Sequence, residues 1–339
     1  RRSVAMTTRR DIAIGKCPRP SYSPDMFGTL LTIFPVFLII IAGYSAGRLG
    51  LVPTESAQAI SKMVIWVPLP ALMFRIVATT DWHAIWDGDF AISSLLGSCI
   101  LFAAGLAIGR WRGLNTVDMA VDGLNASYSN AAYLGLPMLA MAVGPQTSPY
   151  VLFAATATLA SLFCIAVVLA EMASGHGDGH GPRHAVLQAL SSIIRNPLLV
   201  SPMLGLLWWA TGWKLPQVAD RILEMVGNAA SPTALIGIGL LLAQRSLWQA
   251  MANRFVLALS FLKLVIHPLV TAVIALPILH MPRALALTAI LIAAMPVGTG
   301  PFMMTGLYAR DGAVTSGTIL VSTVMSVFTI TAILTFFPL

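Results

Sequence analysis

The chain has 339 residues, of which 57% are hydrophobic and 10% are charged, and its mean hydropathy is +0.83. A soluble domain carries about 25% charged residues, so this composition excludes an ordinary soluble protein and indicates a polytopic membrane protein. The net charge of +7 does not indicate a nucleic-acid partner, because six positive charges lie within the first 25 residues, which show no apolar periodicity. Three widely separated cysteines indicate neither a disulfide framework nor a metal-binding pair, and we expect no cofactor.

Residues 1–25 differ from the rest of the chain and are expected to be a disordered leader or a non-native extension. They are basic and hold three prolines. The apolar run that begins at Met26 is long enough to stay in the membrane, so the stretch is not typical of a secretory signal peptide.

Apolar segments long enough to cross a bilayer follow one another from residue 26 to the end of the chain. A membrane-spanning helix needs about 17–25 predominantly apolar residues. We therefore predict an all-α polytopic membrane protein with about ten spans. The predicted spans are 26–47, 57–79, 89–110, 117–143, 149–171, 194–212, 218–243, 253–279, 284–308 and 313–337.

The spans fall into two halves with a similar plan. In the first half Pro35 is followed by Gly43 eight residues later, and in the second Pro197 is followed by Gly205 at the same spacing. Each half has five spans, an odd number, so the second half enters the membrane with the opposite orientation. This pattern predicts two inverted five-helix repeats, an arrangement found in many secondary transporters.

A hydrophilic segment, residues 173–193, joins the two repeats at 26–172 and 194–339. Its alternating glycines are typical of a flexible linker. A metal site is the alternative, although nothing in the pattern fixes the geometry of the ligands. Its potential ligands are His176, Asp178, His180 and His184.

Two spans contain helix-breaking residues in their interior. The fourth holds Asn130-Ala-Ala-Tyr-Leu-Gly-Leu-Pro137, and the ninth holds Ala293-Ala-Met-Pro-Val-Gly-Thr-Gly-Pro301. A break leaves backbone N–H and C=O groups without partners at a cost of several kcal/mol each, so it survives where it is buried in protein or lines a wet cavity. Two breaks at corresponding positions of two repeats predict the substrate site of a transporter, built by crossing helices 4 and 9.

The chemistry of two helix breaks favours an anion. Each half-helix that begins at a break presents unpaired N–H groups and the positive end of its dipole. The Asn130 amide can donate to a carboxylate, and the surrounding Met, Leu and Val side chains suit an apolar body. We therefore expect a small organic anion. The candidate substrate-binding residues are Ser129, Asn130, Gly135, Pro137, Pro296, Val297, Gly298 and, in the second span, Pro70.

A polar stripe leads along the fourth span to its break. Asp118, Asp122, Asn125, Ser129 and Tyr133 share one helical face. A solvated helix end would explain Asp118, whereas an aspartate at the depth of Asp122 costs about 2.5–3.5 kcal/mol and should face a cavity or a partner. Asp122 is therefore the first candidate for proton coupling. No cluster of carboxylates predicts a sodium site, so we expect proton coupling or electrogenic uniport.

Lys263 and His267 lie four residues apart on one face of the eighth span and precede Pro268. Lys263 is too deep in the span for easy snorkelling to water. Two interpretations stay open: a structural cation that satisfies carbonyl groups freed by Pro268, or a group that compensates charge or couples transport to an ion. The hydroxyl side chains along the tenth span are expected to serve mainly helix packing.

Basic residues predict the orientation of the chain. The loops after spans 1, 3, 5, 7 and 9 hold nine Lys or Arg residues, counting those at the ends of the spans, and the opposite loops hold four. The positive-inside rule then places residues 173–193 in the cytoplasm and both termini on the non-cytoplasmic side of an inner or plasma membrane.

Taken together and in this order, the motifs resemble the auxin efflux carrier family, which includes plant PIN carriers and bacterial malate and malonate permease-like proteins. The resemblance covers essentially all of residues 26–339. It implies ten spans in two inverted repeats, a scaffold and a transport domain, frequent homodimers, and a carboxylate at the crossover near Asn130 and Pro296. The motifs are Pro35-Val-Phe-Leu-Ile-Ile-Ile-Ala-Gly43, Pro70-Ala-Leu72, Asn130–Pro137, Asn196-Pro-Leu198, Ser231-Pro-Thr-Ala-Leu235 with Gly239, Lys263-Leu-Val-Ile-His-Pro268 and Ala294-Met-Pro296.

Two departures from the plant carriers bear on the substrate. Ser129 stands where those carriers have the first crossover proline, which predicts a softer break, and about twenty residues replace their long hydrophilic loop. Small carboxylates or dicarboxylates are therefore expected rather than auxin itself. A non-transporting membrane sensor or scaffold is the alternative, and an intramembrane enzyme is less well supported, because no catalytic motif accompanies Asp118, Asp122 and His267.

Overall fold

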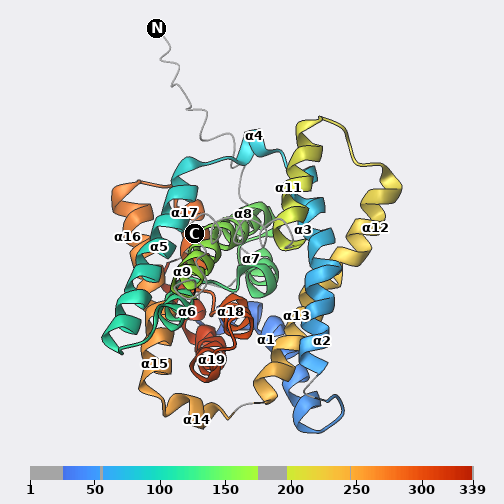
Figure 1. Cartoon of the computed structure of the whole chain (residues 1–339). Coiled ribbons are helices and arrows are strands. Elements are labelled where there is room, and N and C mark those ends of the chain that lie inside the picture. Colours follow the sequence, from blue (N-terminus) through green and yellow to red (C-terminus); the bar gives the residue numbers. More distant parts are fainter. Residues whose placement is uncertain (1–25, 54–55, 175–196, 245, 338–339) are drawn as a thin grey trace.

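The computed structural model describes residues 26–53, 56–174, 197–244 and 246–337 (Figure 1). The predictions for residues 1–25 and for nearly all of the linker at 173–193 lie outside this part of the chain. Within it, every regular element is a helix, apart from one isolated β-bridge. The predicted all-α class is confirmed.

The helices of the first half follow the predicted spans closely, and three of those spans consist of more than one helical piece. The elements are α1 (Met26–Arg48), α2 (Ser56–Trp66), α3 (Pro68–Thr79), α4 (Trp82–Ile85), α5 (Gly88–Trp111), α6 (Thr116–Ser127), η1 (Ala131–Gly135), α7 (Leu136–Ala142), η2 (Pro145–Thr147), α8 (Ser148–Thr158), η3 (Leu159–Phe163) and α9 (Cys164–Ser174).

The second half shows the same kind of segmentation. Its elements are α11 (Pro197–Ala210), α12 (Gln217–Asn228), α13 (Ala230–Ala243), α14 (Leu247–Met251), α15 (Arg254–Phe261), η4 (Leu262–Ile266), α16 (His267–Val273), η5 (Ile274–Ile278), α17 (Arg283–Ala294), α18 (Gly300–Leu307) and α19 (Ala313–Phe336).

Length and composition support a multi-pass membrane protein. In the described residues, six helical stretches are long and apolar enough to cross a bilayer: Lys62–Thr79, Gly88–Trp111, Pro145–Ala170, Gln217–Ala243, Arg254–Ile278 and Ala313–Phe336. Shorter apolar helices cover Phe34–Arg48, Ala131–Ala142, Val200–Ala210 and Arg283–Ala294. A ten-helix inverted repeat remains a prediction.

Helices from the two halves of the chain lie side by side. α1 packs along α13, and α3 packs along α11 and α12 (Figure 1). Small residues permit the first contact: a Cβ atom added to Gly43 in α1 or to Gly239 in α13 would collide with the backbone of the facing helix. Close backbone approach at glycine is a common way of packing helices in membranes.

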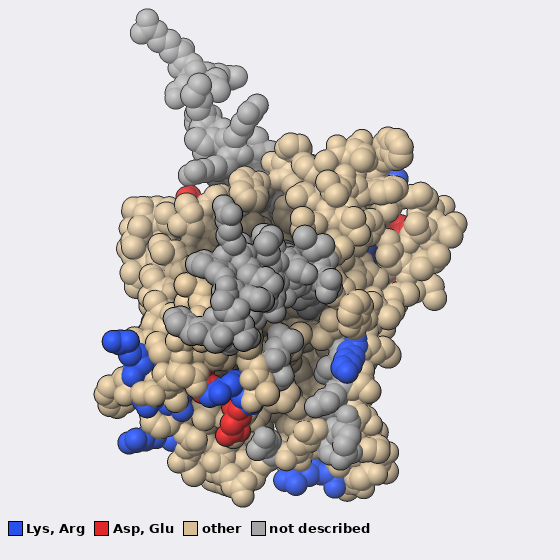
Figure 2. All heavy atoms as spheres, in the orientation of Figure 1, with Lys and Arg blue, Asp and Glu red and all other residues tan. Residues whose placement is uncertain are grey.

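Two clusters of buried apolar side chains hold the fold together. The larger one joins α1, α3, α7, α8, α13, α17 and α19, and the smaller one joins α6, η3 and α9. Many large apolar side chains on the outer surface are exposed, as expected where lipid replaces water. Lysine and arginine side chains gather over the lower part of the surface in Figure 2, where α5 ends and α15 begins.

Candidate functional site

The two predicted breaks lie against each other in the middle of the molecule. Residues 128–130, between α6 and η1, form the first break, and residues 295–299, between α17 and α18, form the second. Ser129 and Val297 form an isolated antiparallel β-bridge. The Asn130 N–H donates to the Pro296 carbonyl at 2.8 Å, and the Gly298 N–H donates to the Tyr128 carbonyl at 3.0 Å. Each break thus satisfies backbone groups of the other, which removes part of the cost of breaking two helices in lipid.

New helices start on the C-terminal side of both breaks. η1, which continues into α7, starts after Asn130, and α18 starts after Thr299, and neither start has a side-chain cap. The first N–H groups of a helix lack intrahelical partners, and its N-terminus carries a partial positive charge. The two starts therefore present donors and positive potential to the same region, an arrangement that favours an anion.

A small cavity, the crossover pocket, lies on one side of the paired breaks and has a volume of about 40 Å³. Its polar wall consists of Tyr128, Ser129, Asn130, Tyr133 and the second-break residues Gly298 and Thr299, and its apolar wall includes Leu69, Leu159, Phe163 and Met303.

Polar side chains at the crossover pocket, Asn130 and Tyr133 among them, lack partners within the described part of the protein. Asn130 is 5% exposed and its side chain forms no hydrogen bond there, and the Tyr133 hydroxyl is buried without a partner. Buried polar groups in native proteins are nearly always hydrogen-bonded, so such groups indicate that something else satisfies them. An amide and a phenol can both donate to a carboxylate.

Glycine is required where the second break meets Tyr128. A Cβ atom on Gly298 or on Gly300 would lie 2.9 Å from carbon atoms of the Tyr128 ring. The ring therefore packs against the backbone at both glycines, which allow the close approach of the two breaks.

A buried lysine lies behind the second break. Lys263, in η4, is fully buried, and its ammonium group donates to the carbonyl of Ala293 at 2.5 Å. The Nζ atom is also 3.2 Å from Nδ1 of His267, whose Nε2 atom is 3.3 Å from the Ser98 hydroxyl. The carbonyl that Lys263 satisfies belongs to the last turn of α17, not to the turn preceding Pro268 as one sequence interpretation had it. Lys263 thus stabilises the broken helix at the end where carbonyl groups are left unpaired.

The hydroxyl side chains of α19 serve more than close packing. Ser322 accepts a hydrogen bond from the N–H of Val297 at 3.1 Å, and Thr315 accepts one from the Asn125 amide at 3.0 Å. Thr318 bonds the carbonyl of Val314 within its own helix. α19 therefore supplies a polar partner to the second break.

The two aspartates of the polar stripe form ion pairs. Asp122 is buried and pairs with Arg112, and Asp118, one turn nearer the helix start, pairs with Arg310 at 2.5 Å. The Cζ atom of Arg112 also lies over the Phe255 ring, 4.1 Å from the ring centroid. Asp122 has the partner that its depth requires, and it does not line the crossover pocket. Its role in coupling stays a prediction.

The structure brings some of the predicted binding residues to the pocket and places others outside its lining. Ser129, Asn130 and Gly298 line it, and Pro296 and Val297 form the pairing of the breaks. Gly135, Pro137 and Pro70 do not line it. The neighbour of Pro70, Leu69, does so instead, because the helix that begins at Pro68 turns that side chain inward.

Sequence reasoning did not assign Tyr128, Tyr133 and Thr299 to the binding site. Tyr133 belongs to the polar stripe, and that spacing could have identified it. Tyr128 and Thr299 are adjacent in sequence to assigned residues, but only the pairing of the two breaks shows that they line the pocket.

Comparison with known proteins agrees with this geometry. Residues 29–334 match the model of a family described as membrane transport protein. A Rhizobium meliloti protein described as "Putative malonate transporter" is 28% identical over 310 residues, covering 89% of this chain and 93% of that protein. Auxin efflux carrier component 8 of Arabidopsis thaliana is 22% identical, covering 84% and 90% of the two chains. The uncharacterized transporter YfdV of Escherichia coli K12 is 25% identical, covering 70% and 75%.

The family and these relatives are described as transporters and not as enzymes. The family match covers most of the chain, including both breaks and Lys263. The chain therefore belongs to the membrane transport protein family, the auxin efflux carrier family that its motifs resemble, and is a multi-pass membrane transporter.

Proposed function

We propose that this protein is a secondary transporter of a small carboxylate or dicarboxylate, bound at the crossover of two broken helices. The observation that carries the proposal is the convergence on one pocket of two uncapped helix starts and the unpartnered Asn130 amide. These groups can surround a carboxylate with donors, while Leu69, Leu159 and Phe163 accommodate a short apolar body.

Malonate is the first substrate to test, because a relative that matches nearly the whole chain is described as a malonate transporter. The departure at Ser129 also favours a small ligand. The described residues that line the pocket include no lysine or arginine, so backbone N–H groups would meet the charge of the ligand. Malate, succinate and indole-3-acetate form the comparison set, which separates dicarboxylates from an auxin-like acid.

The crossover pocket of about 40 Å³ has room for little more than one water molecule, so it must widen before it can take a carboxylate. Leu69 of α3 faces the paired breaks and α8 across this pocket. We propose that α3 and the helices packed along it move relative to the crossover, in an alternating-access cycle based on two inverted five-helix repeats of ten spans in total.

The charge of Lys263 bears on coupling. A fully buried ammonium group behind the crossover can offset part of the negative charge of a bound carboxylate without a metal ion. We propose that transport is proton-coupled or an electrogenic uniport, with Asp122 as first proton carrier and Lys263 and His267 in reserve. We also propose that the protein lies in an inner or plasma membrane, with both termini on the non-cytoplasmic side, and that it forms a homodimer.

Uptake into proteoliposomes tests this function. Radiolabelled malonate should enter vesicles that contain the wild-type protein, in response to a pH gradient or a membrane voltage and without sodium. Asn130→Ala should abolish uptake while the protein still folds and inserts, because a hydrogen bond to a charged group contributes roughly 1.5–3 kcal/mol, about ten- to more than a hundredfold in affinity.

Failure of all four carboxylates to be transported would contradict the proposal in favour of a sensor or scaffold. A strict sodium requirement would contradict the coupling proposal alone. Asn125→Ala is the matched control, because Asn125 lies on the same helix face but donates to Thr315 rather than lining the pocket. Equal loss of uptake and of folding in both variants would remove Asn130 from the binding site.

A further inference from the structure

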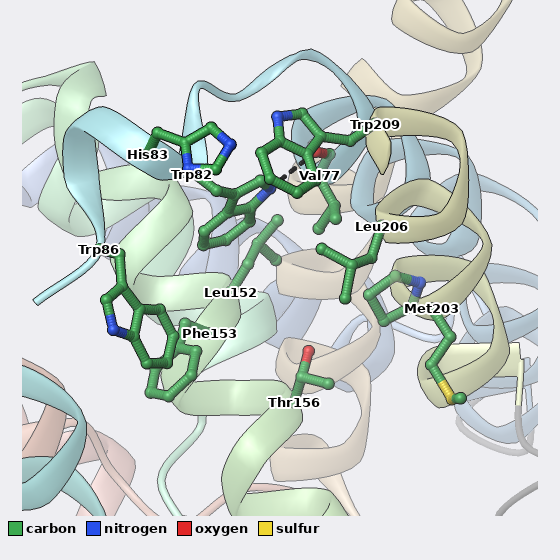
Figure 3. A pocket seen from close by; sticks show the side chains of 11 residues that line it. Val77, Trp82, His83, Trp86, Leu152, Phe153, Thr156, Met203, Leu206 and Trp209 are labelled. Atoms are coloured by element: carbon green, nitrogen blue, oxygen red, sulfur yellow. Dashed lines mark hydrogen bonds between the residues drawn. The ribbon is translucent and has the colours of Figure 1, made fainter. Parts of the chain in front are cut away.

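A second and larger cavity, the aromatic cavity, lies apart from the crossover pocket and has a volume of about 530 Å³. It lies between the ends of α3 and α11 on one side and α4 and α8 on the other (Figures 1 and 3). Three tryptophans, Trp82, Trp86 and Trp209, surround it together with His83 and Phe153. Its volume falls in the range of pockets that hold drug-sized ligands, which is about 300–1,000 Å³.

Contacts among the aromatic side chains shape the wall of this cavity. The centroids of the His83 and Trp209 rings are 4.9 Å apart. The Trp86 and Phe153 rings pack edge to face, with their centroids 5.6 Å apart. The Trp82 indole N–H donates to the carbonyl of Val77 at 2.9 Å, drawn as a dashed line in Figure 3. A belt of tryptophans at the membrane surface would explain their presence, but not a cavity of this volume lined by them.

One polar group inside the cavity lacks a partner. Thr156 of α8 lines its floor, and its hydroxyl points toward the aromatic side chains in Figure 3. That oxygen atom is buried and forms no hydrogen bond, whereas Ser161 on the next turn bonds the carbonyl of Ala157 within the same helical segment. A hydroxyl that leaves its usual intrahelical partner and points into an apolar cavity is suited to one hydrogen bond with a ligand.

The chemistry of the lining differs from that of the crossover pocket. Among the described residues, no lysine, arginine or carboxylate lines the aromatic cavity. Burying a charge without a partner is costly, so the cavity favours an uncharged ligand. Trp86 and Met203, at its rim, are 63% and 59% exposed, which in a membrane protein gives access from the lipid.

We propose that the aromatic cavity is a second, regulatory site for an uncharged aromatic or alicyclic molecule with one hydroxyl group. The molecule enters from the bilayer and hydrogen-bonds Thr156. It bridges α3 and α11 on one side and α8 on the other. α8 carries Ala155, which lines the crossover pocket, and continues into η3, which carries Leu159 and Phe163 of the same pocket. A bound ligand therefore holds α8 against α3 and α11 and slows transport without competing for the substrate site.

The probe for the test is 6-bromo-2-naphthol, a flat uncharged molecule with one hydroxyl group and a heavy atom that quenches nearby tryptophans. Binding to the purified protein in lipid nanodiscs is followed by tryptophan fluorescence, which needs no transport. The result of this binding experiment therefore does not depend on the proposed transport function. The inhibition arm, which rests on that function, measures malonate uptake by proteoliposomes with and without the probe.

Two variants of one residue define the site. Thr156→Phe should fill the cavity and abolish saturable quenching. Thr156→Val, which keeps the shape and removes the hydroxyl, should weaken binding by about two- to tenfold, as expected for one hydrogen bond, and leave uptake without the probe unchanged. The matched control is Ala332→Phe in a separate apolar cavity of about 360 Å³ between α16 and α19, where quenching should remain as in the wild type.

In the binding arm we expect saturable quenching in the wild type and its loss in Thr156→Phe. In the inhibition arm we expect the probe to lower the maximal rate of malonate uptake and to leave the KM for malonate unchanged. Equal quenching in wild type, Thr156→Phe and Ala332→Phe would mean that the probe only enters the lipid, and would overturn the site. Saturable binding that leaves uptake unchanged, or that competes with malonate, would overturn the regulatory role.

Discussion

The two helix breaks at the crossover meet as partners but arise in different ways. The second break and the start of α18 together contain Pro296, Gly298, Gly300 and Pro301, so two prolines remove backbone donors and two glycines leave room for the Tyr128 ring. The first break contains no proline, and Ser129 stands at its centre. Its geometry depends on bonds to the second break, from Asn130 to Pro296 and from Gly298 to Tyr128. The second break is therefore encoded locally, and the first is held open by its partner.

This asymmetry predicts that changes in the second break have the larger effects. Pro296→Ala should allow a continuous helix from α17 into α18, remove the uncapped start of α18 and release the bond to Asn130. We expect a folded protein with malonate uptake reduced by more than about a hundredfold, because the binding geometry of both breaks is lost. Pro35→Ala, in the continuous helix α1, is the control and should keep its activity. Full uptake in Pro296→Ala would show that the second break does not depend on its proline.

Gly298→Ala should have the next largest effect. Its Cβ atom would lie 2.9 Å from the Tyr128 ring, and such overpacking costs about 1–3 kcal/mol. If this strain acts on the site, uptake falls by roughly five- to more than a hundredfold, since each 1.4 kcal/mol is tenfold. The double variant Gly298→Ala with Tyr128→Leu should recover part of the activity. Normal uptake in the single variant would contradict the close fit of the two breaks.

Lys263→Met tests the support of the second break from behind. Loss of the ammonium group leaves the Ala293 carbonyl buried and unsatisfied, at a cost of about 1–3 kcal/mol. We expect a lower Tm for the purified protein, measured by differential scanning fluorimetry, and reduced uptake. The exposed Lys62→Met is the control and should keep the wild-type Tm. An unchanged Tm in Lys263→Met would argue against a structural role and leave charge compensation as the reason for this residue.

Ser129→Pro should have the smallest effect and is the sharpest test of the asymmetry. The bridge between Ser129 and Val297 is formed by the flanking residues, so the N–H of Ser129 is not used in it. Tyr128 already has an extended backbone, with φ −77° and ψ 102°, as the residue before a proline requires. We expect near-normal uptake and a Tm at or slightly above that of the wild type. Complete inactivation would mean that Ser129 contributes more than its backbone position.

The sequence predicts the breaks better than it predicts their surroundings. Proline, glycine and asparagine inside apolar spans are local signals, and they led to Ser129, Asn130 and Gly298 in the pocket. The bond from Lys263 to Ala293 and the one from Val297 to Ser322 join segments about 25 to 30 residues apart, which no local pattern specifies. The spacing of polar residues predicts the helical face that carries Asp122, but its partner Arg112 directly follows the end of α5, and only the packing of α5 against α6 brings the two side chains together.

The residues that do not line the pocket show the same limit. Gly135 and Pro137 belong to the right helix but follow the break by more than one turn, so the helix directs them elsewhere. Pro70 differs from Leu69 by one position, and one position rotates a helix face by about 100°. The aromatic cavity had no sequence signal, because its tryptophans come from two distant segments of the chain.

Direct binding to an isosteric variant tests the central claim, that the crossover binds a carboxylate through Asn130. Asn130→Asp changes an amide to a carboxylate of the same shape, and Asn115→Asp makes the same change at the exposed cap of α6, outside the pocket. Radiolabelled malonate binding to purified protein should weaken by more than about a hundredfold in Asn130→Asp, because a like charge replaces a donor, and should stay within about twofold in Asn115→Asp. Equal malonate affinity in Asn130→Asp and the wild type would contradict a binding site at the crossover.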